Sequence, residues 1–328
     1  MKFVRIAALG LVLLGTIHAA APPAAAEDSS PGECMAVDDA SAGKLIETLH
    51  GEAIDPAAVG ALMEPEVRYF SSDWGSLQGR DAVVAAFTDA KSTFDGLSQT
   101  AEEVLVDAPY VVVRNVLRAR QVGEYAGIAP TGNETEVSAI SVYRLNCGMI
   151  AEAWNFYDHL GQMAQMSDAY AAYQVEVAPS AEMDASCAPP TREDMETLVR
   201  AWFTDFFVND PVMDPAEILN SDMVVHFTAG PDAVGIDAIE QSRDRWWAAF
   251  PDLRYRHGDI IVDGDLAAEL FIAVGTDEGG FLGEEPTGKP VMLEGVVMQR
   301  VNCGRFVEQW GEADIAGAMK QLGVDGLK

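Results

Sequence analysis

The strongest constraint on this sequence is an internal repeat. The stretch RLNCGMIAEAWNFYD at 144–158 returns as RVNCGRFVEQWGEAD at 300–314, with seven of fifteen positions identical. A shift of 156 residues superimposes the two halves without a gap over a long span, and the PTG at 130–132 then meets the PTG at 286–288. A repeat of this kind predicts one folding unit that is used twice.

The first residues are typical of a targeting segment. Lys2 and Arg5 form a basic start, the uncharged run 6–17 follows, and small residues then lead to Ala26. This layout predicts a secretory signal peptide at 1–26. The apolar run is too short to span a bilayer comfortably. We therefore expect an exported protein, periplasmic or secreted, that does not insert into a membrane.

The rest of the chain divides by composition. We predict a first module at 34–174, a linker at 175–190 and a second module at 191–328. The linker, VEVAPSAEMDASCAPP, is rich in Pro, Ala and Ser and interrupts the helical and strand patterns on both sides.

Charge excludes some classes of partner. Without Lys2 and Arg5 the chain has 19 basic and 52 acidic residues, so the net charge is near −33. Nucleic acids and anionic membranes bind through Lys and Arg, so neither is an expected partner. Solubility explains the charge most simply. Recruitment of a cationic ligand is the alternative, and no motif localises it.

Each half has helical patterns first and strand patterns later. Apolar residues recur with helical spacing at 45–50 and 81–94, and at 195–207 and 237–250. Short strands are expected at 67–70 and 223–227. Four further strand patterns follow in the first half, at 98–106, 110–121, 134–145 and 149–158, with counterparts 156 residues later. Short turns join them, which indicates antiparallel hairpins and an α+β fold for each module.

Four cysteines allow three pairings in an exported protein. Each copy has one cysteine before its first helix, Cys34 or Cys187, and one in its last hairpin turn, Cys147 or Cys303. Nearly equal spacing favours Cys34–Cys147 and Cys187–Cys303, one disulfide in each module. Four free thiols are the alternative.

The second half resembles the SnoaL-like polyketide cyclase (ester cyclase) family of the nuclear-transport-factor-2-like superfamily. The motifs are AFPDL, GT followed by GGFLG, PTGK, the pattern R…G…E.W…D, and a closing QLG. The first half is similar but more divergent. The resemblance implies cone-shaped modules, each a curved sheet around helices with a pocket inside. It also implies paired modules, and hence an internal pseudo-dimer of the two copies.

The resemblance assigns site residues one by one. The catalytic base of these cyclases, at the end of the E.W…D strand, corresponds to Asp314 and Asp158. The histidine after the first strand is present as His226, whereas the first copy has Phe70 there.

Two further assignments fall on equivalent strands of the two copies. Of the family's Gly-Thr-His motif, the second copy keeps the threonine, Thr276, but not the histidine. The arginine that comes earlier on this strand in the family is Arg114 in the first copy. Each copy thus keeps a different part of the polar set, which we interpret as at most one working site.

Strand geometry supports a role for the repeated Glu, Trp and Asp. Glu152, Trp154 and Asp158 have the same parity, so they share one face of a regular strand, and the same holds for Glu308, Trp310 and Asp314. Carboxylates beside an indole are costly in a dry core, so a partly wet pocket is expected, with the Trp residues among the substrate contacts.

Each Asp also precedes a helix, where it can act as an N-cap. The two roles are compatible.

We therefore expect binding of a small, largely apolar molecule, with cyclase- or isomerase-type general-base chemistry that needs no cofactor or metal. Such a base takes a proton from a carbon beside a carbonyl, and the enolate then closes a ring. No phosphate loop, metal-ligand spacing or nucleophile elbow is present. A non-catalytic binding or assembly protein on the same fold is the alternative.

Overall fold

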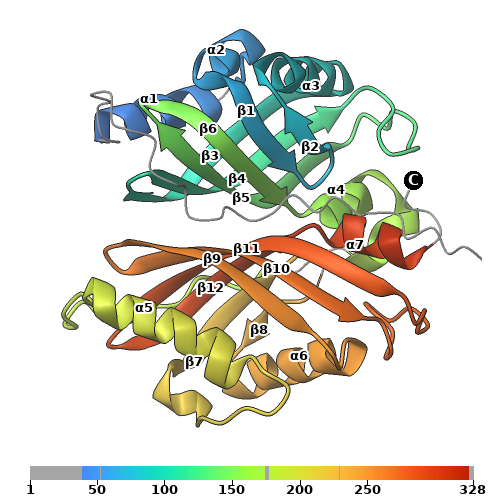
Figure 1. Ribbon diagram of the computed structural model, residues 1–328. Helices are drawn as coiled ribbons and strands as arrows, with labels where there is room; N and C mark the ends of the chain where they lie inside the picture. Colours follow the sequence, from blue (N-terminus) through green and yellow to red (C-terminus); the bar gives the residue numbers. More distant parts are fainter. Residues whose placement is uncertain (1–38, 52, 174–176, 229, 325–328) are drawn as a thin grey trace, which may run out of the picture.

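The computed structural model describes residues 39–51, 53–173, 177–228 and 230–324. It contains two six-stranded sheets, each with its own helices (Figure 1), which confirms the predicted α+β fold with two tandem modules. The predicted signal peptide and Cys34 lie outside the described residues. So do 174–176, and the predicted module boundaries stay predictions.

The first module contains α1 (Asp39–Leu49), α2 (Pro56–Ala61), β1 (Met63–Ser71), β2 (Gly75–Gln78), α3 (Arg80–Thr93), β3 (Phe94–Asp107), β4 (Tyr110–Gln121), β5 (Glu134–Asn146), β6 (Met149–Tyr157), α4 (His159–Met166) and the 3₁₀ helix η1 (Asp168–Tyr173). The second contains α5 (Arg192–Ala201), η2 (Trp202–Phe206), η3 (Pro215–Glu217), β7 (Leu219–Phe227), β8 (Ala233–Val234), α6 (Ile236–Ala249), β9 (Arg254–Asp263), β10 (Leu266–Thr276), β11 (Pro290–Asn302), β12 (Arg305–Ala313) and α7 (Ile315–Leu322).

Both sheets have the same strand order. It is β2-β1-β6-β5-β4-β3 in the first module and β8-β7-β12-β11-β10-β9 in the second. The long hairpins are antiparallel, as predicted, whereas β1 pairs with β6 and β7 with β12 in parallel. Sequence analysis missed α2, β2 and β8, since elements of two to six residues give too few positions for a periodic pattern.

Local sequence explains where α5 begins and how the hairpins β5–β6 and β11–β12 turn. Thr191 and Asp194 form a capping box at the start of α5. The helix predicted over 195–207 ends at Ala201 and continues as one π-helical turn, η2. The repeated Asn-Cys-Gly forms the β5–β6 and β11–β12 turns, where Cys147 and Gly148 have φ of 52° and 75° and Cys303 and Gly304 have 53° and 74°. Two successive positive φ values match the twist of a tight hairpin.

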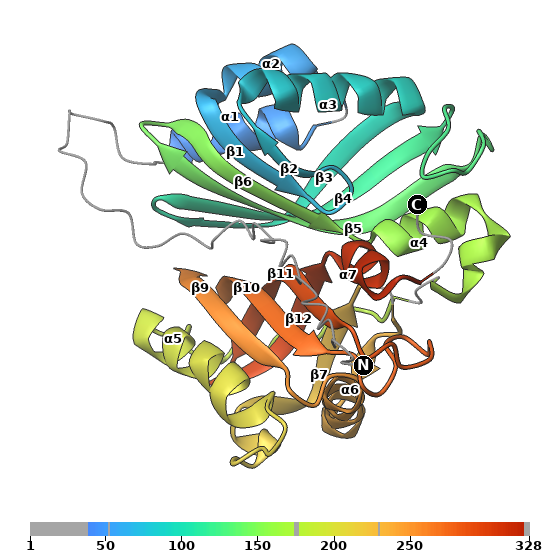
Figure 2. The same cartoon turned by 45° about the vertical axis from the view of Figure 1, so that its right-hand side comes forward.

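The two sheets pack face to face, with α1, α2 and α3 on the outer side of one sheet and α5 and α6 on the outer side of the other (Figures 1 and 2). Two reciprocal hydrogen bonds reflect the internal symmetry. Val106 N donates to Asp263 Oδ2, and Val262 N donates to Asp107 Oδ2, each at 3.0 Å. An apolar layer from both sheets lies between them, with Val142 and Phe156 against Val296 and Met298. The modules therefore form the expected internal pseudo-dimer.

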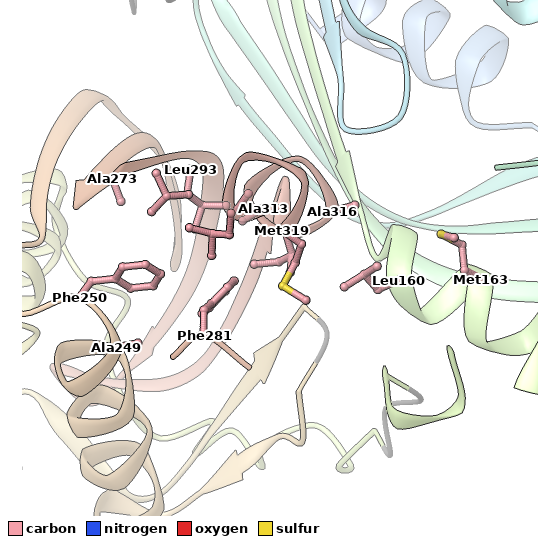
Figure 3. Packing of buried hydrophobic residues seen from close by; sticks show 14 of the residues in the cluster. Leu160, Met163, Ala249, Phe250, Ala273, Phe281, Leu293, Ala313, Ala316 and Met319 are labelled. Atoms are coloured by element: carbon pink, nitrogen blue, oxygen red, sulfur yellow. The ribbon is translucent and has the colours of Figure 1, made fainter. Parts of the chain in front are cut away.

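Helices α4 and α7 meet where the sheets diverge. Leu160 and Met163 of α4 belong to one buried cluster with Ala316 and Met319 of α7, and Figure 3 shows Leu160 pointing toward α7. The cluster continues into the second module through Phe250 and Phe281. This contact fixes the helix starts, and with them Asp158 and Asp314, at the boundary between the modules.

A disulfide joins Cys187 to Cys303, with 5.2 Å between their Cα atoms, as predicted. Cys147 is also disulfide-bonded, but its expected partner Cys34 is not described. Among the described helices, none is both long enough and apolar enough to cross a membrane.

Candidate functional site

The repeated Glu-Trp motif faces the boundary between the modules. Trp310 belongs to the apolar layer between the sheets. Its neighbours Gln309 and Gly311 line the cavity inside the second module. The predicted shared face is thus present, but Trp310 and Trp154 lie between the sheets and not inside a cone. Parity alone assigns residues to a face and does not say which face is the inner one.

Four of the predicted site residues meet in one cleft of about 460 Å³ at this boundary. Arg114 and Asp158 come from the first module, and His226 and Trp310 from the second. We call it the polar cleft; its lining also includes Ser138, Asp232 and Glu312.

Trp310 joins the two sides of the polar cleft. The Arg114 Cζ lies 4.5 Å from the centre of the indole ring, which is a cation–π contact across the module boundary. The His226 ring is nearly parallel to the indole, at 6.0 Å and 10°. Arg114 also pairs with Glu102 at 2.6 Å.

His226 is held as a cation by two carboxylates. Its Nδ1 lies 2.7 Å from Asp232 Oδ2 and its Nε2 lies 3.1 Å from Glu308 Oε1. Burial disfavours the charged imidazolium, but the two carboxylates outweigh it and raise the pKa of His226 to about 9. At neutral pH both ring nitrogens therefore donate, and His226 is not a free base.

Glu312 and Asp158 are neighbouring carboxyl groups in the polar cleft. Both side chains are buried. Burial, with the nearby Asp158 charge as a second cause, raises the pKa of Glu312 to about 8. Thr228 Oγ1 lies 2.8 Å from Glu312 Oε2 and 2.9 Å from the Gly311 carbonyl oxygen. Because this hydroxyl has one hydrogen, it can donate to Gly311 while a protonated Glu312 donates to it.

The cleft related by the internal symmetry is lined mainly by apolar residues, with Arg256, Asp259 and Glu294 as its charged members. It measures about 60 Å³, and Phe70, Leu270 and Phe156 occupy the positions of His226, Arg114 and Glu312. We call it the apolar cleft; the predicted contact Trp154 lines it. Its wall also contains Glu294, the counterpart of Ser138, and burial and the charge of Asp314 raise the pKa of Glu294 to about 7.

Both predicted catalytic aspartates are N-caps. Asp158 Oδ1 accepts from Gly161 N at 2.9 Å, and Asp314 Oδ1 accepts from Gly317 N at 2.8 Å. A Cβ on either glycine would overlap the capping carboxylate, which explains why the glycine is repeated. Burial raises the pKa of Asp314 to about 6. Asp158 lines the polar cleft, whereas Asp314 lines none of the cavities described here.

Thr276 lies apart from the other predicted residues. Its backbone N and its hydroxyl donate to Asp252 at 2.6 and 2.9 Å, at the exposed end of β10. The repeated Arg and Glu form cross-strand pairs in both modules: Arg144 faces Glu152, and Arg300 faces Glu308 at 3.6 Å.

The interior of the second module is aromatic. A cavity of about 80 Å³ is lined by Trp202, Phe203, Phe207, Trp246, Tyr255, Phe271 and further apolar residues. We call it the second cone. It shares Phe227, Thr228 and Trp246 with an adjoining hollow of about 460 Å³ that reaches the 279–283 loop. Glu312 is the one acidic residue among the described residues that line this cavity; its carboxyl oxygens bond Ser138 and Thr228, and it borders the polar cleft as well.

The interior of the first module is polar at the equivalent positions. At equivalent positions the first module has Asn115 where the second has Phe271, Asn155 where it has Gly311, and Tyr157 where it has Ala313. Asp73 accepts hydrogen bonds from Ser71 and Tyr157, and burial raises its pKa. The two interiors have therefore diverged in chemistry while the backbone pattern is retained.

Sequence analysis missed Glu312 and Asp73. Glu312 replaces Phe156 of the first copy and Asp73 has Ala229 as its counterpart, so a search for repeated residues passes over both. A charged residue in one copy opposite a neutral residue in the other is the signal that would have found them. Among the described residues, one group places possible metal ligands together, Asp184 with Cys187 and Cys303, but its two sulfur atoms form the disulfide.

Two curved sheets that enclose separate cavities define a tandem α+β protein of the cone-shaped, small-molecule-binding type. Both modules match the family model of the SnoaL-like polyketide cyclases, at residues 44–166 and 197–322, and the chain belongs to this family. No curated protein matches the chain.

Solved structures of similar modules each align with about two fifths of the chain. A putative SnoaL-like polyketide cyclase from Jannaschia sp. CCS1 is 23% identical with a TM-score of 0.37, covering 43% of this chain and 98% of its own. TsrD from Streptomyces laurentii is 27% identical with a TM-score of 0.35, covering 40% and 98%. IdmH, a putative polyketide cyclase from Streptomyces antibioticus, is 28% identical with a TM-score of 0.34, covering 40% and 100%.

Proposed function

We propose that the second cone binds a small, largely apolar molecule and that Glu312 exchanges a proton with it. The observation that carries this proposal is an acidic residue that lines an aromatic cavity and whose buried carboxyl group has its pKa raised to about 8. Apolar cavities with a few polar groups are the usual small-molecule sites. A carboxyl group whose pKa lies near the working pH is suited to general acid–base chemistry.

The chemistry follows from the two protonation states of Glu312. In its ionised form it takes a proton from a carbon beside a carbonyl group, which leaves an enolate. In its protonated form it returns a proton to carbon or oxygen, which gives exchange or isomerisation. Attack of the enolate on a second carbonyl of the same molecule gives ring closure. The rate of the base-catalysed step should rise as pH approaches 8.

Asp314 and Asp158 are the alternative candidates for the base, since the family resemblance implies them. The N-cap hydrogen bond occupies one oxygen of each. The raised pKa of Asp314, about 6, suits a base at neutral pH. Glu312 is the stronger candidate because it lines the second cone, which Asp314 does not.

Proton exchange tests the proposal without knowledge of the natural substrate. We would follow deuterium incorporation from D2O into 2-tetralone, an apolar bicyclic ketone, by NMR, and its binding by saturation transfer. The wild-type protein should bind the ketone and speed exchange. Glu312→Gln should bind it but lose most of that rate, whereas Asp314→Asn and Asp158→Asn should retain it.

Three results would contradict the proposal. Exchange that survives in Glu312→Gln removes Glu312 as the acid–base group, and loss in Asp314→Asn would assign the role to Asp314. Binding without exchange in the wild type would favour the non-catalytic alternative, in which the second cone only holds its ligand.

Export is part of the same proposal. The Cys187–Cys303 disulfide supports it, because disulfides persist mainly in extracytoplasmic compartments. Expression of the full chain should give a mature protein that begins near Glu27, as measured by intact mass. An unprocessed chain in the cytoplasm would contradict this.

A further inference from the structure

The differences between the two copies are complementary across the module boundary. Arg114 of the first copy has Leu270 as its counterpart, and His226 of the second copy has Phe70. Within a single module, each replacement of a polar residue by an apolar one leaves an incomplete site. Across the boundary the two retained residues line the same polar cleft, and the two apolar replacements line the other cleft.

The polar cleft contains a hydrogen-bond donor without an acceptor. Among the described residues, the Nε of Arg114 is buried and has no hydrogen-bond partner, although the same guanidinium pairs with Glu102 and lies on Trp310. A buried unsatisfied donor costs about 1–3 kcal/mol, so an acceptor is expected to complete the site. The cleft, with about 460 Å³, has room for one.

The charges around the polar cleft favour a neutral ligand. Asp158, Asp232 and Glu136 face it together with the Arg114–Glu102 pair and the His226 cation. A carboxylate would be repelled by the acidic groups, whereas an ammonium ion has no acceptor for the Arg114 guanidinium and would be repelled by it. A neutral carbonyl oxygen accepts from the guanidinium without either cost. Val116, Val137 and Phe227 supply apolar wall for the rest of the molecule.

We propose that the polar cleft is a composite binding site for a neutral small molecule with a carbonyl oxygen, which accepts from Arg114 of the first copy beside Glu312 of the second. Ser138 of the first copy bonds one oxygen of Glu312, so each copy contributes to holding the acid. The site goes beyond the second cone, whose lining does not include Arg114.

Three probes of equal shape test the ligand class: cyclohexanecarboxamide, cyclohexanecarboxylate and cyclohexylmethylammonium. Isothermal titration at pH 6.5 should show the tightest binding for the carboxamide. Arg114→Leu, which copies the counterpart residue, should weaken that binding about tenfold or more through loss of a charged donor. Arg120→Leu is the matched control, because Arg120 lies on the same strand in an exposed pair with Asp95; it should leave the affinity unchanged.

The outcomes separate this proposal from the proposed function. Failure of the carboxamide to bind, equal or tighter binding of either charged probe, or unchanged affinity in Arg114→Leu would each overturn the composite site. If Arg114→Leu does not fold, Arg114→Lys keeps the charge without the Nε donor and should lose the same affinity. The two proposals are tested separately, because 2-tetralone exchange reports on Glu312 in the second cone, whereas carboxamide affinity reports on Arg114, which does not line that cavity.

Discussion

The polar and apolar clefts are the same piece of backbone geometry with opposite chemistry. In one, Arg114, His226 and Glu312 surround about 460 Å³; in the other, Leu270, Phe70 and Phe156 leave about 60 Å³. A homodimer of identical modules would have two equal clefts. Covalent duplication removed that symmetry, so one cleft acquired buried charges while the other became part of the apolar interface.

The largest expected difference concerns His226. His226→Phe copies the apolar cleft but leaves Asp232 buried without its cation and Glu308 with only the longer pair to Arg300, which should lower the free energy of unfolding by about 3–5 kcal/mol. Phe70→Leu, the matched change in the apolar cleft, should cost about 1 kcal/mol. Urea denaturation of both variants measures the difference, and equal costs would contradict the charge account.

The second prediction concerns pH. The native pKa of Glu312, about 8, lies above its ordinary value of 4.5. Its contribution to stability is therefore complete below pH 4.5 and is lost as pH rises through 8. Between pH 5 and 7 the wild type should lose about 1.4 kcal/mol per pH unit relative to Glu312→Gln, about 3 kcal/mol in all. Parallel stability curves for the two proteins would contradict this.

The third prediction concerns introduction of the polar residues of the polar cleft into the apolar cleft. Phe70→His with Leu270→Arg places an imidazole and a guanidinium in the apolar cleft, near Glu294. An added cation should lower the pKa of Glu294, now about 7, by about one unit or more. NMR titration of labelled glutamate side chains would show it. The control Phe70→Tyr with Leu270→Met should leave that pKa in place.

The smallest effect is expected where the two halves are alike. Asp158→Asn and Asp314→Asn should each lower the free energy of unfolding by no more than about 0.5 kcal/mol, because asparagine caps helices as well as aspartate does. The alanine variants should each cost about 1 kcal/mol. A large loss in only one of the asparagine variants would show that its carboxylate does more than cap a helix.

The repeat explains what could be predicted. Periodicity and the 156-residue offset gave the helices, the hairpin strands, the tandem modules and the Cys187–Cys303 pairing, because each depends on local pattern or on spacing. The site was harder to predict. Arg114 and His226 looked like remnants of two incomplete sites because their meeting depends on how the sheets face each other. Glu312 carried no signal in the repeat, since its chemistry depends on burial beside Asp158.

The most direct test is the pKa of Glu312 itself. A ¹³C NMR titration of side-chain-labelled glutamate, with Glu312→Gln used to assign the resonance, measures it in the intact protein. The structure predicts a midpoint near pH 8, raised by burial and by the charge of Asp158. A midpoint near 4.5 would mean that Glu312 is an ordinary ionised carboxylate, and would contradict the proposed acid–base centre.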